Sequence, residues 1–369
     1  MRRHVIMKRI TFCALLMTLF LLLSCGSGQQ PEAGKGGSAA TGGRSLSEVL
    51  MEVGRSAENA FYSFLELLSD TLGFTAKSTT KKSDVGGYFN SLGAKLGKAS
   101  DELEQVAKKS EGEGEGAKDE PIAVAIRSAV DSAKATLSTL KTHLDSLKDI
   151  GDDNQKVGEA ASDAGAKEGT AVNEESLKKS LKALKGIVEE AGKSGISKPE
   201  TGTVTLNVTG VDNKDGAKIL ATNSAGNPAA GDAGKAAAIL STVSGEEMLA
   251  SIVNSKDTDA VLGAGANGDT TAISFAKGGN NAANVAQAEA KAAAVAGGIA
   301  LRSLIKDGKL AKAADGQGGG KEVQGVGITA ANKLLVAVED IIKKTVKNVL
   351  KTAKEKIDQA RAPKVASQQ

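Results

Sequence analysis

Apolar residues recur every three or four positions along several stretches of the chain, a spacing typical of helices that bury one face. The first stretch covers residues 45–72 and is followed by Gly73, a residue type that often ends helices. The last begins at Thr329, which can cap its first turn, and stops before Pro363. At 1.5 Å per residue, these two predicted helices would be about 40 Å and 50 Å long.

The same spacing predicts further helices between these two. They are expected at residues 84–109, 121–150, 174–191, 232–240 and 246–253, followed by an alanine-rich helix at 284–306. Gly87, Gly93 and Gly97 fall within the helix at 84–109, where each glycine weakens the helix by up to ~1 kcal/mol. We therefore expect another helix to pass close to these three positions.

Strand and loop patterns occupy the rest of the chain. Apolar and polar residues alternate from Thr203 to Val208, which predicts one short strand. Polar, glycine-rich stretches at 152–172, 255–283 and 312–326 are predicted as loops. These patterns together predict a mainly α fold with short β-strand content.

The N-terminus combines a basic start, an apolar run over residues 12–23 and a cysteine after Leu22-Leu23-Ser24. These features are typical of a secretory signal peptide, and the run is shorter than the ~20 residues that a membrane-spanning helix needs. The last four residues, ending in Cys25, resemble a bacterial lipobox, so we predict cleavage after Ser24 and lipidation of Cys25. The alternatives are an ordinary signal peptide with an incidental cysteine, or an uncleaved anchor.

The predicted domain organisation follows from this start. Residues 1–24 form a lipoprotein signal peptide, and residues 25–44, rich in Gly, Ser, Ala and Thr, form a lipidated flexible tether. Residues 45–362 form a single helical domain with a variable-looking middle at about 150–285, and residues 363–369 form a C-terminal tail. We expect an elongated helical bundle whose long N- and C-terminal helices pair antiparallel near the membrane, with short β-strands and Gly-rich loops at the distal end.

The charge of the chain gives no support for nucleic-acid binding. The full sequence carries 47 basic and 44 acidic residues, a net charge of +3. Segment 1–24 contains four basic and no acidic residues, so its removal leaves 43 basic and 44 acidic residues, a net charge of about −1. The remaining charges are interspersed, which indicates a solvated surface rather than a nucleic-acid groove.

Few side chains are available for catalysis or metal binding. After processing and lipidation the chain would have no free thiol, and His143, expected at a solvated helix position, would be its only histidine. No paired-carboxylate motif stands out, although the composition is compatible with carboxylate-only catalysis. We therefore expect no enzymatic activity, no cofactor and no metal site.

Three weaker motifs each have a simpler interpretation. Residues 111–116 alternate Glu and Gly, and a solvated loop is preferred here to a cation site. Residues 263–268 fit G-x-G-x-x-G, but neither the preceding strand nor the following helix that dinucleotide binding requires is evident. Residues 316–321 end in Gly-Lys but lack the first glycine of a P-loop.

Residues 299–311, Ile299 to Ala311, closely resemble the invariable segment of the variable large proteins of Borrelia and of the related Lyme-disease variable surface antigen. The start of the helical domain, residues 45–74, and the C-terminal residues 341–350 are similar to the same family. The middle of the chain does not match position by position, and in this family the middle is expected to vary.

The resemblance implies an outer-surface lipoprotein, lipid-anchored to the outer membrane, that acts as an antigenically variable major surface antigen. Its implied partners are the outer membrane and host antibodies, and serial variant switching would evade those antibodies without catalysis. The alternative is an adhesin that binds a host factor, and homo-oligomers are left open. The family's invariable segment is expected to have a structural role, and its apolar residues Ile299, Leu301 and Leu304 are expected to face the core. Its site residues are Ile299, Leu301, Arg302, Leu304, Lys306, Asp307, Gly308 and Lys309.

Overall fold

The computed structural model describes most of the predicted helical domain. The described residues all belong to one compact unit, 44–369. They are 51–57, 59, 73–111, 121–162, 164–208, 210–314 and 318–361. The predicted signal peptide, the tether with Cys25, most of the first predicted helix and the C-terminal tail lie outside these residues.

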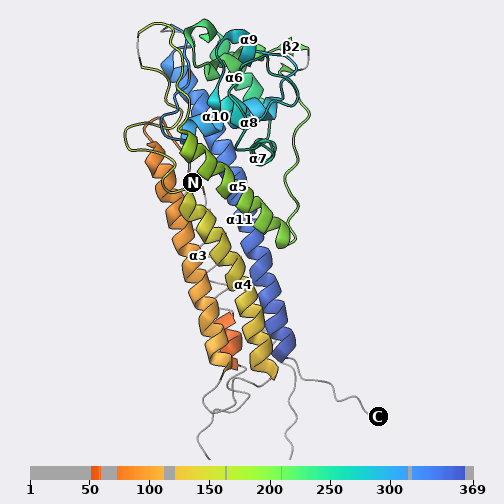
Figure 1. Ribbon diagram of the computed structural model, residues 1–369. Coiled ribbons are helices and arrows are strands. Elements are labelled where there is room, and N and C mark those ends of the chain that lie inside the picture. Colours follow the sequence, from red (N-terminus) through yellow and green to blue (C-terminus); the bar gives the residue numbers. More distant parts are fainter. Residues whose placement is uncertain are drawn as a thin grey trace, which may run out of the picture. The chain divides into compact units, whose positions relative to one another are not determined.

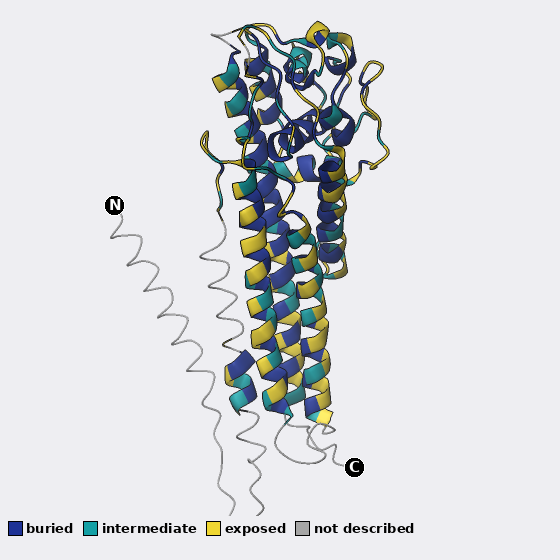
Figure 2. Cartoon of the chain, turned by 60° about the vertical axis from the view of Figure 1, so that its left-hand side comes forward, coloured by how far each residue is buried: buried dark blue, intermediate teal, exposed yellow. Residues whose placement is uncertain are grey.

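Three long helices lie side by side in this unit (Figure 1). They are α3 (Lys82–Ser110), α4 (Pro121–Ser146) and α11 (Gly320–Arg361), and α4 packs against both of the others. The 42 residues of α11 correspond to about 63 Å of helix at 1.5 Å per residue. Figure 2 shows buried residues along the sides of the long helices that face one another and exposed residues on their outer sides, as the three-to-four spacing predicts.

A second group of elements surrounds one buried helix, α10 (Ala292–Leu304), which contacts α6, α7, α8, α11 and α3. Every residue of α10 is buried. Helix α5 (Glu174–Lys193) packs against α4, α11 and α7. The short elements are η2 (Lys214–Leu220), η3 (Ser224–Gly226), α6 (Asp232–Ser241), α7 (Gly245–Val253), α8 (Ala272–Lys277), α9 (Ala282–Val285) and the antiparallel pair β1 (Asn207–Val208) and β2 (Val211–Asp212).

Several predicted helices are confirmed within a few residues, namely α3, α5, α6 and α7. Helix α4 ends at Ser146, four residues before the predicted end, although Leu147 and Ile150 remain buried. The predicted start of α11 at Thr329 is wrong, because the helix begins nine residues earlier. Thr329 lies inside it and donates its hydroxyl proton to the Gly325 carbonyl at 2.8 Å. Glycines made this first part of α11 look like a loop, but Gly327 is needed there, since a Cβ would lie 2.6 Å from Gly158 Cα.

The alanine-rich helix predicted at 284–306 is confirmed as α10 over its second part. Its first part is wrong, because α9 ends at Val285 and a non-helical connection separates it from α10. At the end of this connection the backbone pairs with an extended segment: Ala292 N–H donates to the Val204 carbonyl at 2.9 Å, and Leu206 N–H to the Ala290 carbonyl at 3.1 Å. The predicted strand at 203–208 is therefore only partly regular, with β1 at its end. The loop predicted at 255–283 contains α8, which begins after the capping residue Thr271.

The glycines of α3 have different roles. A Cβ on Gly93 would lie 2.9 Å from the Asp145 carboxylate of α4, which confirms the predicted close approach there. At Gly87 nothing lies within 4 Å, so the prediction is wrong for that residue. The tightest approach is at Gly86, where a Cβ would collide with the Lys148 carbonyl oxygen.

Residues 51–57 are helical, and the described residues on either side of 60–72 follow α11 in the opposite direction. Gly54 lies beside the C-terminal end of α11, since a Cβ there would be 2.6 Å from Arg361 Nη2. Further along the chain, Ala76 N–H donates to Asn332 Oδ1 at 2.8 Å. Asn332 precedes Arg361 by 29 residues in α11, so the described residues from Gly54 to Ala76 run antiparallel to α11 at these two contacts. Within the described part of the chain, no single helix has the length and apolarity to cross a membrane, and α6 and α7 meet that criterion only as a pair bent by 94°.

Candidate functional site

The segment 299–309 comprises the second half of α10 and the turn that follows it. Ile299, Leu301 and Leu304 are buried, as their helical spacing predicts. After α10 the backbone turns at Asp307, whose φ of 68° makes it the one non-glycine residue with positive φ in the described chain. Asp307 is exposed and Gly308 is buried, and the lysines that flank this pair, Lys306 and Lys309, are half-buried.

Arg302 projects from α10 to the C-terminal end of α8 and is fully buried. Its Nε and Nη2 donate to the Ala276 carbonyl at 3.0 Å and 2.7 Å, and Nη2 also donates to the Phe275 carbonyl at 3.3 Å. The carbonyls at a helix C-terminus carry partial negative charge, so they compensate part of the buried positive charge. Burial lowers the pKa of Arg302 to about 9.

Lys82, the first residue of α3, is a second fully buried cation beside the same segment. Its Nζ donates to three carbonyl oxygens, those of Arg302 at 3.2 Å, Ile305 at 2.6 Å and Gly308 at 2.6 Å, which we call the carbonyl cradle. Three acceptors match the three N–H bonds of an ammonium group. Burial lowers the pKa of Lys82 to about 7, while the charges of Asp152 and Glu159 oppose that shift.

The carbonyl cradle joins the start of α3 to the end of α10 through the Lys82 ammonium group, which no carboxylate of the described residues contacts directly. The neighbouring backbone is held as well: Lys306 N–H donates to the Ile150 carbonyl at 2.8 Å, and Lys309 pairs through its backbone with Thr170. Neither buried cation is accessible for chemistry on a ligand. The arrangement fixes the turn after α10, and among the described residues no three His, Cys, Asp or Glu side chains gather closely enough to hold a metal ion.

Sequence reasoning missed Lys82 as a buried residue. A signal was available, because Lys82 lies three residues before Val85 and seven before Phe89 and is therefore on the apolar stripe of α3. Arg302 was included in the candidate segment, but its spacing did not indicate that its charge would be buried against α8.

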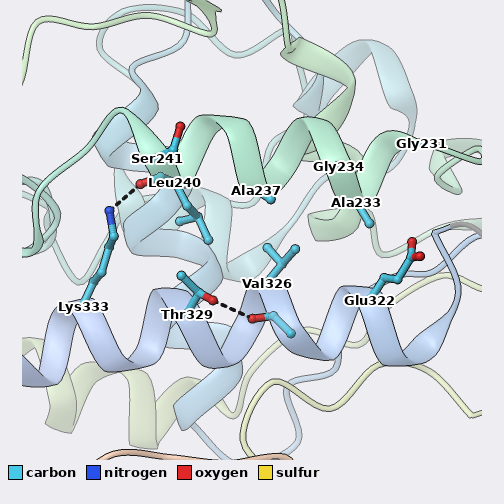
Figure 3. A pocket seen from close by; sticks show the side chains of 11 residues that line it. Gly231, Ala233, Gly234, Ala237, Leu240, Ser241, Glu322, Val326, Thr329 and Lys333 are labelled. Atoms are coloured by element: carbon cyan, nitrogen blue, oxygen red, sulfur yellow. Dashed lines mark hydrogen bonds between the residues drawn. The ribbon is translucent and has the colours of Figure 1, made fainter.

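A groove of about 770 Å³ between α6 and α11 is the second candidate site (Figure 3). Leu240 and Val326 line it from opposite sides, and its polar side chains are already bound to backbone groups. Lys333 Nζ donates to the carbonyls of Leu240 at 2.6 Å and Val243 at 2.7 Å, and Glu322 accepts from Gly318 N–H. The groove therefore offers mainly apolar surface and no set of groups suited to catalysis.

The remaining candidates from the sequence are not brought together. His143 is half-buried rather than solvated, because its imidazole lies over Gly186 of α5, and burial lowers its pKa. The glycine motif at 263–268 lies in a loop, and α8 begins only at residue 272. Of the acidic loop only Glu111 is described, and its carboxylate pairs with Arg127.

The sequence profile of the family described as Borrelia lipoprotein matches residues 57–357. The chain belongs to this family. It is 61% identical over 373 residues to variable large protein 25 of Borrelia hermsii, with both chains covered in full. Identity is 57% with variable large protein 7, over 98% of this chain and 97% of the relative, and 31% with variable large protein 12, over 95% and 92%.

Among solved structures, the crystal structure of the Lyme disease variable surface antigen VlsE of Borrelia burgdorferi is similar, with a TM-score of 0.67 and 27% sequence identity. The match covers 85% of this chain and 98% of VlsE. These findings confirm the family resemblance and the mainly α fold. This Borrelia lipoprotein family member is thus related to variable surface proteins, and none of the relatives described here is named as an enzyme.

Proposed function

We propose that this Borrelia lipoprotein family member is a major surface antigen, anchored by lipid on Cys25 to the outer membrane, whose replacement by related variants evades host antibody. The observation that carries the proposal is the 61% identity to a variable large protein over the whole chain. The similarity to a surface antigen in three dimensions supports it. In this proposal the protein acts by display, with the outer membrane and host antibodies as its partners and no catalysis.

The distribution of buried and exposed residues suits such a role. The turn after α10 and the contacts between the long helices depend on buried groups that tolerate little change. The loop between α7 and α8 carries many exposed residues, and Val261 within it is 46% exposed. Surface substitutions usually change the free energy of unfolding by no more than ~0.5 kcal/mol. Loops of this kind can therefore change their antibody-binding surface while the helices keep one fold.

Anchoring through Cys25 has a physical requirement. A single acyl chain holds a protein only marginally at a membrane, whereas two or more bind firmly at ~0.8 kcal/mol per buried CH₂. We therefore expect a multiply acylated N-terminal cysteine and release of the chain when Cys25 is replaced by alanine.

Protease treatment of intact cells tests the display. Loss of this protein while a periplasmic control survives is the expected result, and protection of both would contradict surface exposure. Cys25→Ala should move the protein from the membrane fraction to the soluble fraction, with wild type as the control. Recovery of Cys25→Ala in the membrane fraction would mean that some other feature anchors it.

Antigenic variation needs a separate measurement. Antiserum against this chain should bind cells that display it, and should bind poorly to cells that display variable large protein 7. Transfer of the loop segments 256–271 and 197–205, in which most residues are exposed, from this chain to that relative should restore part of the binding. Equal binding to both wild-type proteins would contradict the variant-switching proposal.

A further inference from the structure

The loop between α7 and α8 contains Asn267-Gly268, which is the single Asn-Gly step in the sequence. Both residues are exposed. Asn-Gly steps are chemically labile, because a glycine places no side chain in the way when its backbone nitrogen approaches the preceding asparagine side chain. Whether a folded protein permits this reaction depends on the hydrogen bonds and freedom of that particular loop.

The hydrogen bonds of this loop leave the reacting groups available. Asn267 Oδ1 accepts from Asp269 N–H at 2.8 Å, an arrangement that folds the amide side chain back over the peptide that follows it. Asn267 N–H donates to Thr270 Oγ1 at 2.9 Å, and Thr270 N–H donates to the Asn267 carbonyl at 3.2 Å. In the described part of the chain, Gly268 N–H donates no hydrogen bond.

We propose that Asn267 is a self-modification site that deamidates through a cyclic imide in the folded protein. The Gly268 nitrogen attacks Asn267 Cγ and forms a new C–N bond, and negative charge develops on Oδ1. Asp269 N–H already lies 2.8 Å from that oxygen and stabilises the charge. The Gly268 proton passes through solvent to the departing side-chain nitrogen, and the Cγ–Nδ2 bond breaks to release ammonia.

Water then opens the imide at one of its two carbonyls. Cleavage at Cγ gives aspartate, and cleavage at the backbone carbonyl gives isoaspartate, whose main chain is one methylene longer. The net reaction consumes one water and releases one ammonia, so no other reactant is needed. Each product adds one negative charge to an exposed loop.

Two Asp-Gly steps in the described chain show the opposite arrangement. Gly216 N–H donates to the Asn213 carbonyl at 2.9 Å, and Gly308 N–H donates to the Ile305 carbonyl at 3.3 Å. Both glycines are buried. The nitrogen that would attack is occupied in each case, so the fold blocks imide formation after Asp215 and Asp307 and leaves it open after Asn267.

The experiment uses the purified, folded chain incubated at physiological temperature, at neutral and at mildly alkaline pH. Peptide mapping by mass spectrometry follows the amide-to-acid mass change, and isoaspartate is counted by enzymatic methylation. We expect Asn267 to react at least about tenfold faster than any other described asparagine, and faster at alkaline pH, where the Gly268 nitrogen loses its proton more readily.

Gly268→Ala is the matched variant. The nearest atoms to an added Cβ are 3.8 Å and 3.9 Å away, so the loop accommodates alanine and the reaction should slow several-fold. The same chain unfolded in urea should form isoaspartate at Asp215 and Asp307, which the folded chain should not. A folded protein in which Asn267 stays intact while the unfolded chain reacts there would overturn the proposal, as would equal rates for wild type and Gly268→Ala.

Discussion

Replacement of Lys82 by methionine tests how the turn after α10 is held. Methionine has a similar length and no N–H donor, so the carbonyl cradle would lose its donor. The Arg302 and Gly308 carbonyls have no other donor among the described residues, whereas the Ile305 carbonyl also accepts from Gly308 N–H. A buried acceptor left unsatisfied costs ~1–3 kcal/mol, so the two carbonyls together cost about 2–6 kcal/mol.

Part of this loss is offset, because Lys82→Met also removes the cost of burying an ammonium group. We expect a net decrease of about 2–4 kcal/mol in the free energy of unfolding. Urea titration followed by circular dichroism measures it. Native-state hydrogen exchange should show faster exchange at Lys306 and Gly308, whose backbone N–H groups are bonded around this turn.

Lys81→Met is the matched control, because Lys81 is the exposed neighbour of Lys82 and undergoes the same chemical change. Its unfolding free energy should remain within ~0.5 kcal/mol of wild type. Lys82→Met could instead leave the unfolding free energy equally unchanged, with the amides after α10 still protected from exchange. In that case the carbonyl cradle would not hold the turn. The reasoning from unsatisfied carbonyls would then be refuted.

The stability difference between wild type and Lys82→Met should also depend on pH. Burial lowers the folded-state pKa of Lys82 to about 7, whereas an unfolded lysine titrates near ~10.4. Between these values the unfolded chain binds the proton more tightly, so wild-type stability should rise with pH relative to Lys82→Met. Below pH 7 both states carry the proton and the difference should be flat. A difference that stays constant up to pH 10 would mean that the three carbonyls keep the ammonium charged.

Three other substitutions have clear expected outcomes. Gly186→Ala should destabilise the protein by ~1–3 kcal/mol in thermal unfolding, because the new Cβ collides with the His143 imidazole, while Gly87→Ala, with nothing within 4 Å, should stabilise it by ~0.5–1 kcal/mol. Destabilisation by both would contradict the geometry. Hydrogen bonds from Lys134 and Arg127 lower the pKa of Glu104 to about 2. Wild type should therefore have a larger free energy of unfolding than Glu104→Gln at neutral pH. This difference should disappear as pH falls from about 4.5 to about 2, and a difference that persists in acid would count against the ion pair.

The long helices could be read from the sequence because their stabilising pattern is local. Apolar residues of α3, α4 and α11 recur at the helical period, and those stripes are the surfaces that the helices bury. The identity of the family was also readable, from thirteen residues at 299–311. Helix ends were less predictable where glycines intervene, as in α11, because a glycine that lowers helix propensity also permits the close packing seen at Gly327.

Other features depended on contacts between residues far apart in the chain. The break between α9 and α10 arises because residues 290–292 pair with an extended segment more than eighty positions earlier, which overrides the helix propensity of alanine.

The burial of Lys82 was decided in the same way. Its acceptors come from residues more than two hundred positions away, and a lysine on an apolar stripe does not reveal which carbonyls will meet it. Local sequence thus determined which faces are apolar, and the tertiary structure decided which polar groups could be buried, because a buried charge is stable only where the rest of the fold supplies its partners.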